Sequence, residues 1–222
     1  MCYSPVMSRR STEPGTFREP KQKRTREQLA RILTAADSLF SEHGYAGTRL
    51  EDIAALVPCS MSAIYDRFSS KEQLLHYMHR QGTEAAIAMI DQIQPVAVSD
   101  TDLREVLPGA LQVGLEMIRQ FGGRRRAVLE RMHSDPILLE LELELRNALV
   151  ASGQRFLLAY RHQIRHSDPP LAAAQAMRLM ILLTEERQAP ISSSKDLHLN
   201  DEMFIQETCR MVVGYLGIPP SD

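Results

Sequence analysis

Apolar residues along most of the chain recur every three to four positions, which is the spacing of one face of an α-helix. This spacing predicts a first helix over residues 25–43, ended by Gly44, a residue that tolerates positive φ. Two shorter helices are predicted over 48–56 and 60–67. The apolar positions of these three segments are Leu29, Ile32, Leu33, Ala36, Leu39, Phe40, Ile53, Ala54, Val57 and Ile64.

The rest of the chain continues the helical pattern. Leu and Glu alternate over 138–145, which would suit a strand, but both residues favour helices and the apolar series keeps helical spacing beyond the run. Asp135-Pro136 and Asn200 provide helix starts, and Gly217 provides a stop. We therefore expect an all-α protein. Its further helices are predicted over 70–93, 102–121, 124–133, 136–165, 170–188 and 200–216.

Composition agrees with a globular helical protein. Of the 222 residues 44% are hydrophobic, and the net charge is -2, so affinity for nucleic acid must come from locally placed charge. The three cysteines form no CxxC pair, and no apolar run approaches a membrane span. We expect a cytoplasmic protein. Residues 1–24 are basic and lack periodicity, which predicts a disordered arm, either simply solvated or in contact with DNA phosphates.

Residues 48–71 hold the outline of a helix-turn-helix. Thr48, with Glu51 three residues on, has capping-box spacing at the start of the first helix. Ser70 and Gln73 repeat that spacing at the start of a following helix. A helix-turn-helix lays its second helix in the major groove, so this segment predicts DNA binding.

The same segment resembles the tetracycline-repressor (TetR) family of transcriptional regulators. The resemblance rests on Asp52-Ile53-Ala54, Ile64-Tyr65, Phe68 and Ser70-Lys71-Glu72, in the family's order and spacing. It implies a helix-turn-helix domain over 25–72, containing three helices, and a helical effector-binding and dimerisation domain over 73–222. Two residues depart from the family pattern: Pro58 replaces a turn glycine, and Asp66 stands where histidine is common.

By this resemblance, the recognition helix spans 60–66, and Arg49 and Lys71 lie at helix starts suited to phosphate contacts. Tyr65 is expected to reach a phosphate, with a simple core ring as the alternative. The predicted DNA-contacting residues are Thr48, Arg49, Ser60, Met61, Ser62, Ala63, Tyr65, Asp66, Arg67 and Lys71.

The resemblance also implies a homodimer and a small-molecule effector, which we expect to be partly apolar. The helices at 170–188 and 200–216 would form a four-helix interface with the partner subunit. Helices between 75 and 165 would enclose the effector, and Met adapts to varied apolar ligands. The candidate pocket residues are Met117, Phe121, Phe156, Tyr160 and Met177.

No catalytic, metal or cofactor site is predicted, because the chain lacks a P-loop, a dinucleotide glycine pattern and GxSxG. His162 and His166 have metal-ligand spacing on the predicted helix, but surface or polar-network roles are favoured for them and for His76 and His79. The basic triplet 124–126 is expected to be solvated. The favoured function is a homodimeric repressor released by its effector, not an enzyme. The alternative is an all-α small-molecule-binding protein or enzyme with a vestigial helix-turn-helix.

Overall fold

The computed structural model describes residues 23–58, 60–92, 101–120, 122–188 and 199–219, and within these ranges all regular secondary structure is helical, as predicted. The predicted arm over 1–24 lies almost wholly outside the described residues. None of the described helices is long and apolar enough to cross a membrane. The helices are α1 (Lys23–Gly47), α2 (Leu50–Leu56), α3 (Met61–Tyr65), α4 (Lys71–Gln92), α5 (Leu103–Gln120), α6 (Gly122–Arg131), α7 (Pro136–Ala159), the 3₁₀ turn η1 (Arg161–Gln163), α8 (Pro169–Gln188) and α9 (Asp201–Leu216).

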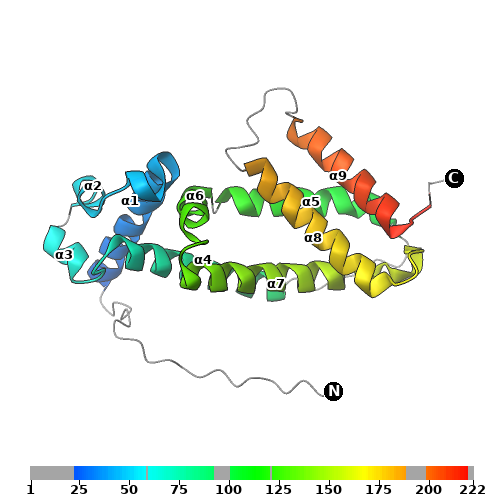
Figure 1. The fold of residues 1–222 in the computed structure, drawn as a ribbon, viewed down its shortest axis with the longest axis horizontal. Helices are drawn as coiled ribbons and strands as arrows, with labels where there is room; N and C mark the ends of the chain where they lie inside the picture. The colour runs from blue at the N-terminus through cyan, green and yellow to red at the C-terminus, as the bar shows by residue number, and fades with distance from the viewer. Residues whose placement is uncertain (1–22, 59, 93–100, 121, 189–198, 220–222) are drawn as a thin grey trace, which may run out of the picture.

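One hydrophobic core lies at the end of the molecule that carries α2 and α3 (Figure 1). We call this part the head: α1, α2, α3, the first half of α4, α6 and the start of α7. Its core joins the helix-turn-helix to residues far along the chain, because Ala127, Val128 and Leu138 pack with the side chains of α1–α4. The predicted domain 25–72 therefore shares its core with α6 and with the first turn of α7.

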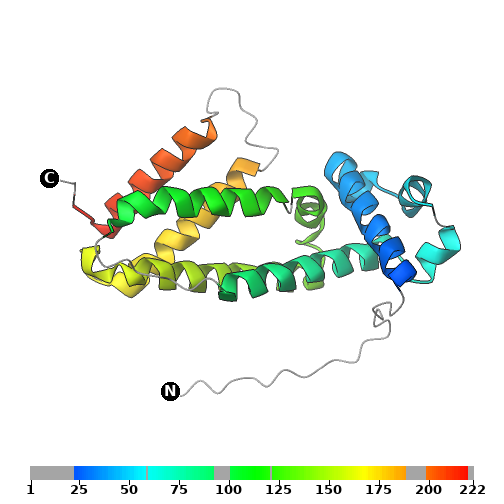
Figure 2. The same ribbon diagram turned by 180° about the vertical axis from the view of Figure 1, so that it is seen from behind.

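A second hydrophobic core forms the rest of the molecule, which we call the body. It consists of α5, the second half of α7, α8 and α9, with Leu107, Leu157 and Val212 among its buried residues. Helices α8 and α9 lie on one side of α5 and α7, and the reverse view shows α4 and α5 in front (Figures 1 and 2). Helix α4 runs from the head along α7 and so connects the two parts.

Several predicted helix ends are confirmed by their hydrogen bonds. Asp135 Oδ1 accepts from Ile137 N at 3.1 Å and from Leu138 N at 3.3 Å, so α7 starts with the expected cap. Asn200 Oδ1 accepts from Met203 N at 2.8 Å, and Gly217 closes α9 in the left-handed conformation. Side-chain caps and left-handed glycines act within one helical turn, which is why the sequence reveals them.

The predicted cap of α2 is wrong, because Arg49 occupies that position and its N–H donates to Asp52 Oδ2 at 3.2 Å. The Thr48 side chain is fully buried instead. Its hydroxyl donates to Gly44 O at 2.7 Å and lies 3.1 Å from Leu39 O. The side chain of Thr48 therefore satisfies carbonyl groups at the end of α1 rather than amides at the start of α2.

The predicted helix over 136–165 is too long. Helix α7 ends at Ala159, and η1 follows. Tertiary contacts hold this turn: Gln163 Nε2 donates to Thr101 O, and Gln163 Oε1 accepts from Leu103 N, each at 2.9 Å. His162 and His166 consequently do not share a helix, and their predicted metal-ligand spacing does not occur.

The basic triplet 124–126 is not simply solvated, contrary to expectation. Arg124 N donates to Asp37 Oδ1 at 3.1 Å, and Arg126 Nη1 donates to Glu42 O at 2.8 Å near the end of α1. Arg125 enters an ion network with α7 and α8. The sequence could not reveal these contacts, because the partners come from distant elements.

Candidate nucleic-acid interface

Helices α2 and α3 lie at the outer end of the head (Figure 1). Ile53 of α2 and Ile64 of α3 are fully buried against the α1 and α4 residues of the head core, so both short helices are held by tertiary packing. Ser60 Oγ accepts from Ala63 N at 3.3 Å and caps α3. These contacts fix the helix that the sequence predicts to be the recognition helix.

Pro58 fits the turn between α2 and α3. Val57, the residue before it, has φ −124° and ψ 144°, which is the extended conformation that a following proline favours. Among the described residues, positive φ occurs only at Gly44 and Gly217. The departure from the family's turn glycine therefore requires no strained residue among those described.

The structure places the predicted contact residues at the start of α2, along α3, and at the start of α4. Thr48 is buried, whereas the remaining nine are at least partly accessible. Those that are exposed are Arg49, Ser60, Ser62, Tyr65 and Asp66, and those that are half-buried are Met61, Ala63, Arg67 and Lys71.

Tyr65 is at the surface, so the alternative of a core ring does not hold. Tyr65 is 48% exposed, and its hydroxyl donates to Glu51 Oε1 at 3.4 Å. Arg67 Nη2 donates to Gln28 Oε1 at 3.3 Å, which ties the end of α3 to α1. A long bond to an exposed carboxylate leaves the Tyr65 hydroxyl able to exchange partners for a phosphate oxygen.

Lys71 is more constrained than its predicted role suggests. Its Nζ donates to Tyr45 O at 2.5 Å and to Thr48 O at 2.6 Å, and lies 4.1 Å from the centroid of the Tyr45 ring. Burial lowers the pKa of this amine from its ordinary value of 10.5. With two of its three protons engaged, Lys71 has one left for a phosphate.

Glu130 of α6 positions the last residues of α1, which follow the non-helical Gly44. Its Oε2 accepts from Tyr45 N at 2.8 Å and from Ala46 N at 3.3 Å. Gly44 has φ 69°, and a Cβ there would collide with the Glu130 carboxylate. This role of Glu130 could not be predicted from the sequence, because no local pattern connects it to Ala46, 84 residues earlier.

The predicted effector residues lie mainly in the body. Phe156 and Tyr160 of α7 are in contact, with ring centroids 5.7 Å apart, and Tyr160 is buried. Met177 of α8 packs against Gly153 of α7, and Met117 is half-buried on α5. Phe121 lies outside the described residues.

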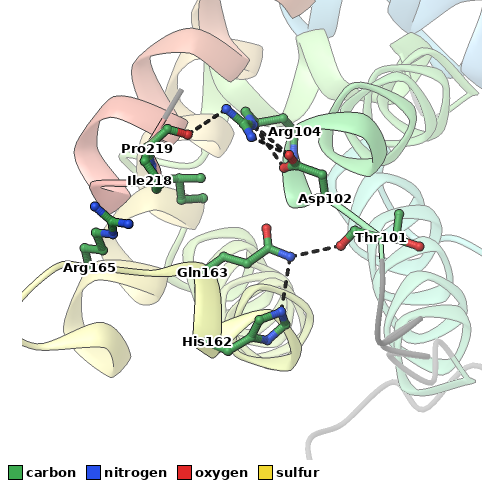
Figure 3. A pocket seen from close by; sticks show the side chains of 8 residues that line it. All are labelled: Thr101, Asp102, Arg104, His162, Gln163, Arg165, Ile218 and Pro219. Carbon is green, nitrogen blue, oxygen red and sulfur yellow. Dashed lines mark hydrogen bonds and ion pairs between the residues drawn. The ribbon is translucent and has the colours of Figure 1, made fainter. Parts of the chain in front are cut away.

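An open cavity of about 340 Å³ lies at the end of the body, away from the helix-turn-helix (Figure 3). Its lining includes polar groups that are already paired: Arg104 binds Asp102 and donates to Pro219 O at 2.6 Å. None of the predicted effector residues lines it. The full lining is Thr101, Asp102, Arg104, His162, Gln163, Arg165, Ile218 and Pro219.

Comparison with known proteins identifies the domain that contains these helices. Residues 32–78 match the family described as "Bacterial regulatory proteins, tetR family". The helix-turn-helix segment is therefore similar to the tetR family. The matched residues include all of α2 and α3, and they end within α4.

Two relatives from Mycobacterium tuberculosis are similar to part of this chain. An uncharacterised HTH-type transcriptional regulator is 33% identical over 78 residues, or 33% of this chain and 39% of the relative. An HTH-type transcriptional repressor is 37% identical over 65 residues, or 29% of this chain and 35% of the relative. The chain thus aligns with less than half the length of these relatives.

The fold similarity extends over nearly the whole chain. A crystal structure of a TetR-family transcriptional regulator from Mesorhizobium loti superposes with a TM-score of 0.66 and covers 88% of this chain and 98% of that one. Sequence identity is 19%. The fold, an N-terminal helix-turn-helix followed by a C-terminal helical domain, is therefore shared with that structure.

Proposed function

We propose that this protein is a DNA-binding transcriptional regulator that represses transcription as a homodimer and leaves its operator when a small molecule binds. The observation that carries the DNA-binding role is a helix-turn-helix that matches the tetR family and exposes Arg49 at the start of α2 and Tyr65 at the end of α3. The side chains exposed there suit DNA, because hydroxyl, phenol and guanidinium groups donate hydrogen bonds to phosphate oxygens. The proposed role is regulatory rather than enzymatic.

The operator is sought in the DNA upstream of the protein's own coding sequence by an electrophoretic mobility shift titration. We expect sequence-selective binding that weakens with salt, because phosphate contacts release counterions. Tyr65→Ala and Arg49→Ala should each weaken it roughly tenfold, corresponding to about 1–2 kcal/mol. Arg161→Ala, on the exposed turn η1 in the body, is the matched control and should leave affinity unchanged.

Two outcomes of this titration would contradict the proposal. The first is the absence of any selective complex at low salt with any upstream fragment. The second is full affinity in both Tyr65→Ala and Arg49→Ala, which would remove α2 and α3 from the interface. A complex that forms equally with unrelated DNA would reduce the role to non-specific binding.

Dimerisation is supported by the apolar surface of α8 and α9. Large apolar side chains are about half exposed on both helices, although a folded chain normally buries such residues. They are Leu171 and Leu182 on α8, and Met203, Met211 and Tyr215 on α9. A second copy of the same face would cover them and would set the distance between two recognition helices, ~34–36 Å for successive major grooves.

Repression and effector release extend the proposal. One relative is named a repressor, and Phe156, Tyr160, Met117 and Met177 offer an apolar surround for a ligand between α5, α7 and α8. A ligand that binds only one spacing of the recognition helices must lower operator affinity reciprocally. A promoter–reporter fusion tests the sign: deletion of the regulator should raise expression, and a fall would indicate an activator.

A further inference from the structure

We propose that Glu72, His76 and Asp135 bind a divalent transition-metal ion such as Zn²⁺ where α4 meets the start of α7. One ligand atom from each residue lies within 4.8 Å of those from the other two. His76 Nε2 is 2.7 Å from Asp135 Oδ2. Zinc–nitrogen and zinc–oxygen bonds of about 2.0–2.2 Å place adjacent ligand atoms roughly 3 Å apart, so only small shifts would close this group around an ion.

Two rigid elements hold the three side chains. Glu72 and His76 are four residues apart in α4, which places them on one face of the helix. Asp135 is held by the cap of α7, because its Oδ1 accepts from Ile137 N and Leu138 N while Oδ2 contacts His76. Helix packing therefore brings the three side chains together without an ion, and ion binding would not break the cap of α7.

Burial and donor chemistry define the kind of ion. Asp135 and His76 side chains are 4% and 19% exposed, whereas Glu72 is 48% exposed, so one side of the site is open for water ligands. One imidazole nitrogen with two carboxylate oxygens suits Zn²⁺, Co²⁺ or Mn²⁺. A bound ion would take the Nε2 lone pair of His76, so the ring would then carry its proton on Nδ1.

Arg131 is the group with which the ion competes. Its Nη2 lies 3.3 Å from Glu72 Oε1, and its guanidinium stands 5.1 Å from the centroid of the Tyr45 ring. In the metal-free protein this guanidinium compensates the Glu72 charge, and it must give way when an ion takes that carboxylate. Removing Arg131 should therefore strengthen metal binding, whereas removing a ligand should weaken it.

The test is a titration of Co²⁺ into the full chain without DNA, followed by visible absorption and by calorimetry. Cys2→Ser and Cys59→Ser in the parent protein remove two of the three thiols, and the third, Cys209, is buried in the core of the body. We expect one Co²⁺ per chain, displaced by Zn²⁺. His76→Gln should abolish binding and Glu72→Gln should weaken it at least about tenfold. Arg131→Met should tighten it roughly fivefold.

His43→Gln, which removes an exposed histidine from α1, is the matched control and should bind like the parent. The proposal would be overturned if the parent did not bind Co²⁺, or if Glu72→Gln and His76→Gln both bound it as tightly as the parent. Glu72 is exposed, so its substitution tests the site even where His76→Gln impairs folding. Because no DNA is present, the result stands apart from that of the operator titration.

Discussion

Thr48 belongs to the stretch that carries the family pattern, yet its side chain acts inside the head. Its hydroxyl is fully buried and is close to the carbonyl oxygens of Gly44 and Leu39. A buried carbonyl that loses its donor keeps its desolvation penalty. At the scale of one residue, Thr48 therefore stabilises the connection between α1 and α2, although it lies in a motif that binds DNA.

The first prediction at this scale concerns Thr48→Val, which keeps the side-chain shape and removes the hydroxyl. We expect the free energy of unfolding to fall by about 1–2 kcal/mol, measured by urea denaturation. Thr34→Val is the control, because the Thr34 hydroxyl donates to Ala30 O at 3.0 Å at an exposed position. Its effect should stay within roughly 0.5 kcal/mol. Equal losses in both variants would refute the special role of the buried hydroxyl.

At the scale of elements, α4 meets α7 through buried polar groups as well as apolar ones. His79 of α4 lies 3.1 Å from Glu142 of α7, and Arg125 of α6 joins Glu142 to Glu185 of α8. Arg146 contacts Glu185 at 2.6 Å. Four helices thus share one ion network, and a break in it would leave a buried charge without its partner.

This network predicts a dependence of stability on pH. Burial raises the pKa of Glu142, but the His79 imidazole, 3.1 Å away, and the charge of Arg125 outweigh it and lower the pKa from 4.5 to about 2. The unfolded chain therefore takes up this proton first as pH falls. Stability from Glu142, at most about 3 kcal/mol, is complete above pH ~4.5 and is lost toward pH ~2.

Urea denaturation at neutral and acid pH measures this loss. Glu142→Gln should flatten the acid part of the stability profile, because the titrating carboxyl is gone. Glu144→Gln, two residues along α7 and exposed, should keep the parent profile. Parallel acid losses in the parent and in Glu142→Gln would assign the dependence to other groups.

At the scale of the whole molecule, the head and body have separate cores joined by α4 and by the polar contacts of α6. Glu130 and Arg126 of α6 bind backbone groups at the end of α1, so α6 packs with the head although the chain reaches it after α5. A change in the body that moves α6 would reach the helix-turn-helix through these contacts. The proposed release by an effector uses this connection.

The proposed dimer gives a prediction at the same scale. Leu182→Arg with Met211→Arg should convert a dimer of twice the 25.1 kDa chain mass into a monomer, measured by light scattering after size exclusion. Charged groups on the apolar face of α8 and α9 would have to be buried without partners. The affinity of the double variant for the operator should fall because the dimer is lost. Leu143→Arg, a substitution of a similarly exposed leucine on α7, should leave the mass unchanged.

A monomeric parent protein would contradict the dimer directly. A double variant that remains dimeric would place the interface on another surface. Retention of full operator affinity by a monomeric double variant would separate DNA binding from dimerisation.

Features that depend on neighbours within one or two helical turns could be predicted from the amino-acid sequence. The helical class follows from apolar spacing, and the caps at Asp135 and Asn200 and the stop at Gly217 follow from local backbone chemistry. The helix-turn-helix was also readable, because its pattern of residues is compact and lies within one short segment.

Contacts between residues far apart in the chain could not be predicted in this way. Arg49, not Thr48, is the N-cap of α2, because the Thr48 hydroxyl donates to a carbonyl group near the end of α1. The helix predicted to reach 165 stopped at Ala159, and Gln163 turned to Thr101 and Leu103. His76 and Asp135, 59 residues apart, came together between two helices. Local pattern encodes each helix, but the partners of a polar side chain depend on how those helices pack.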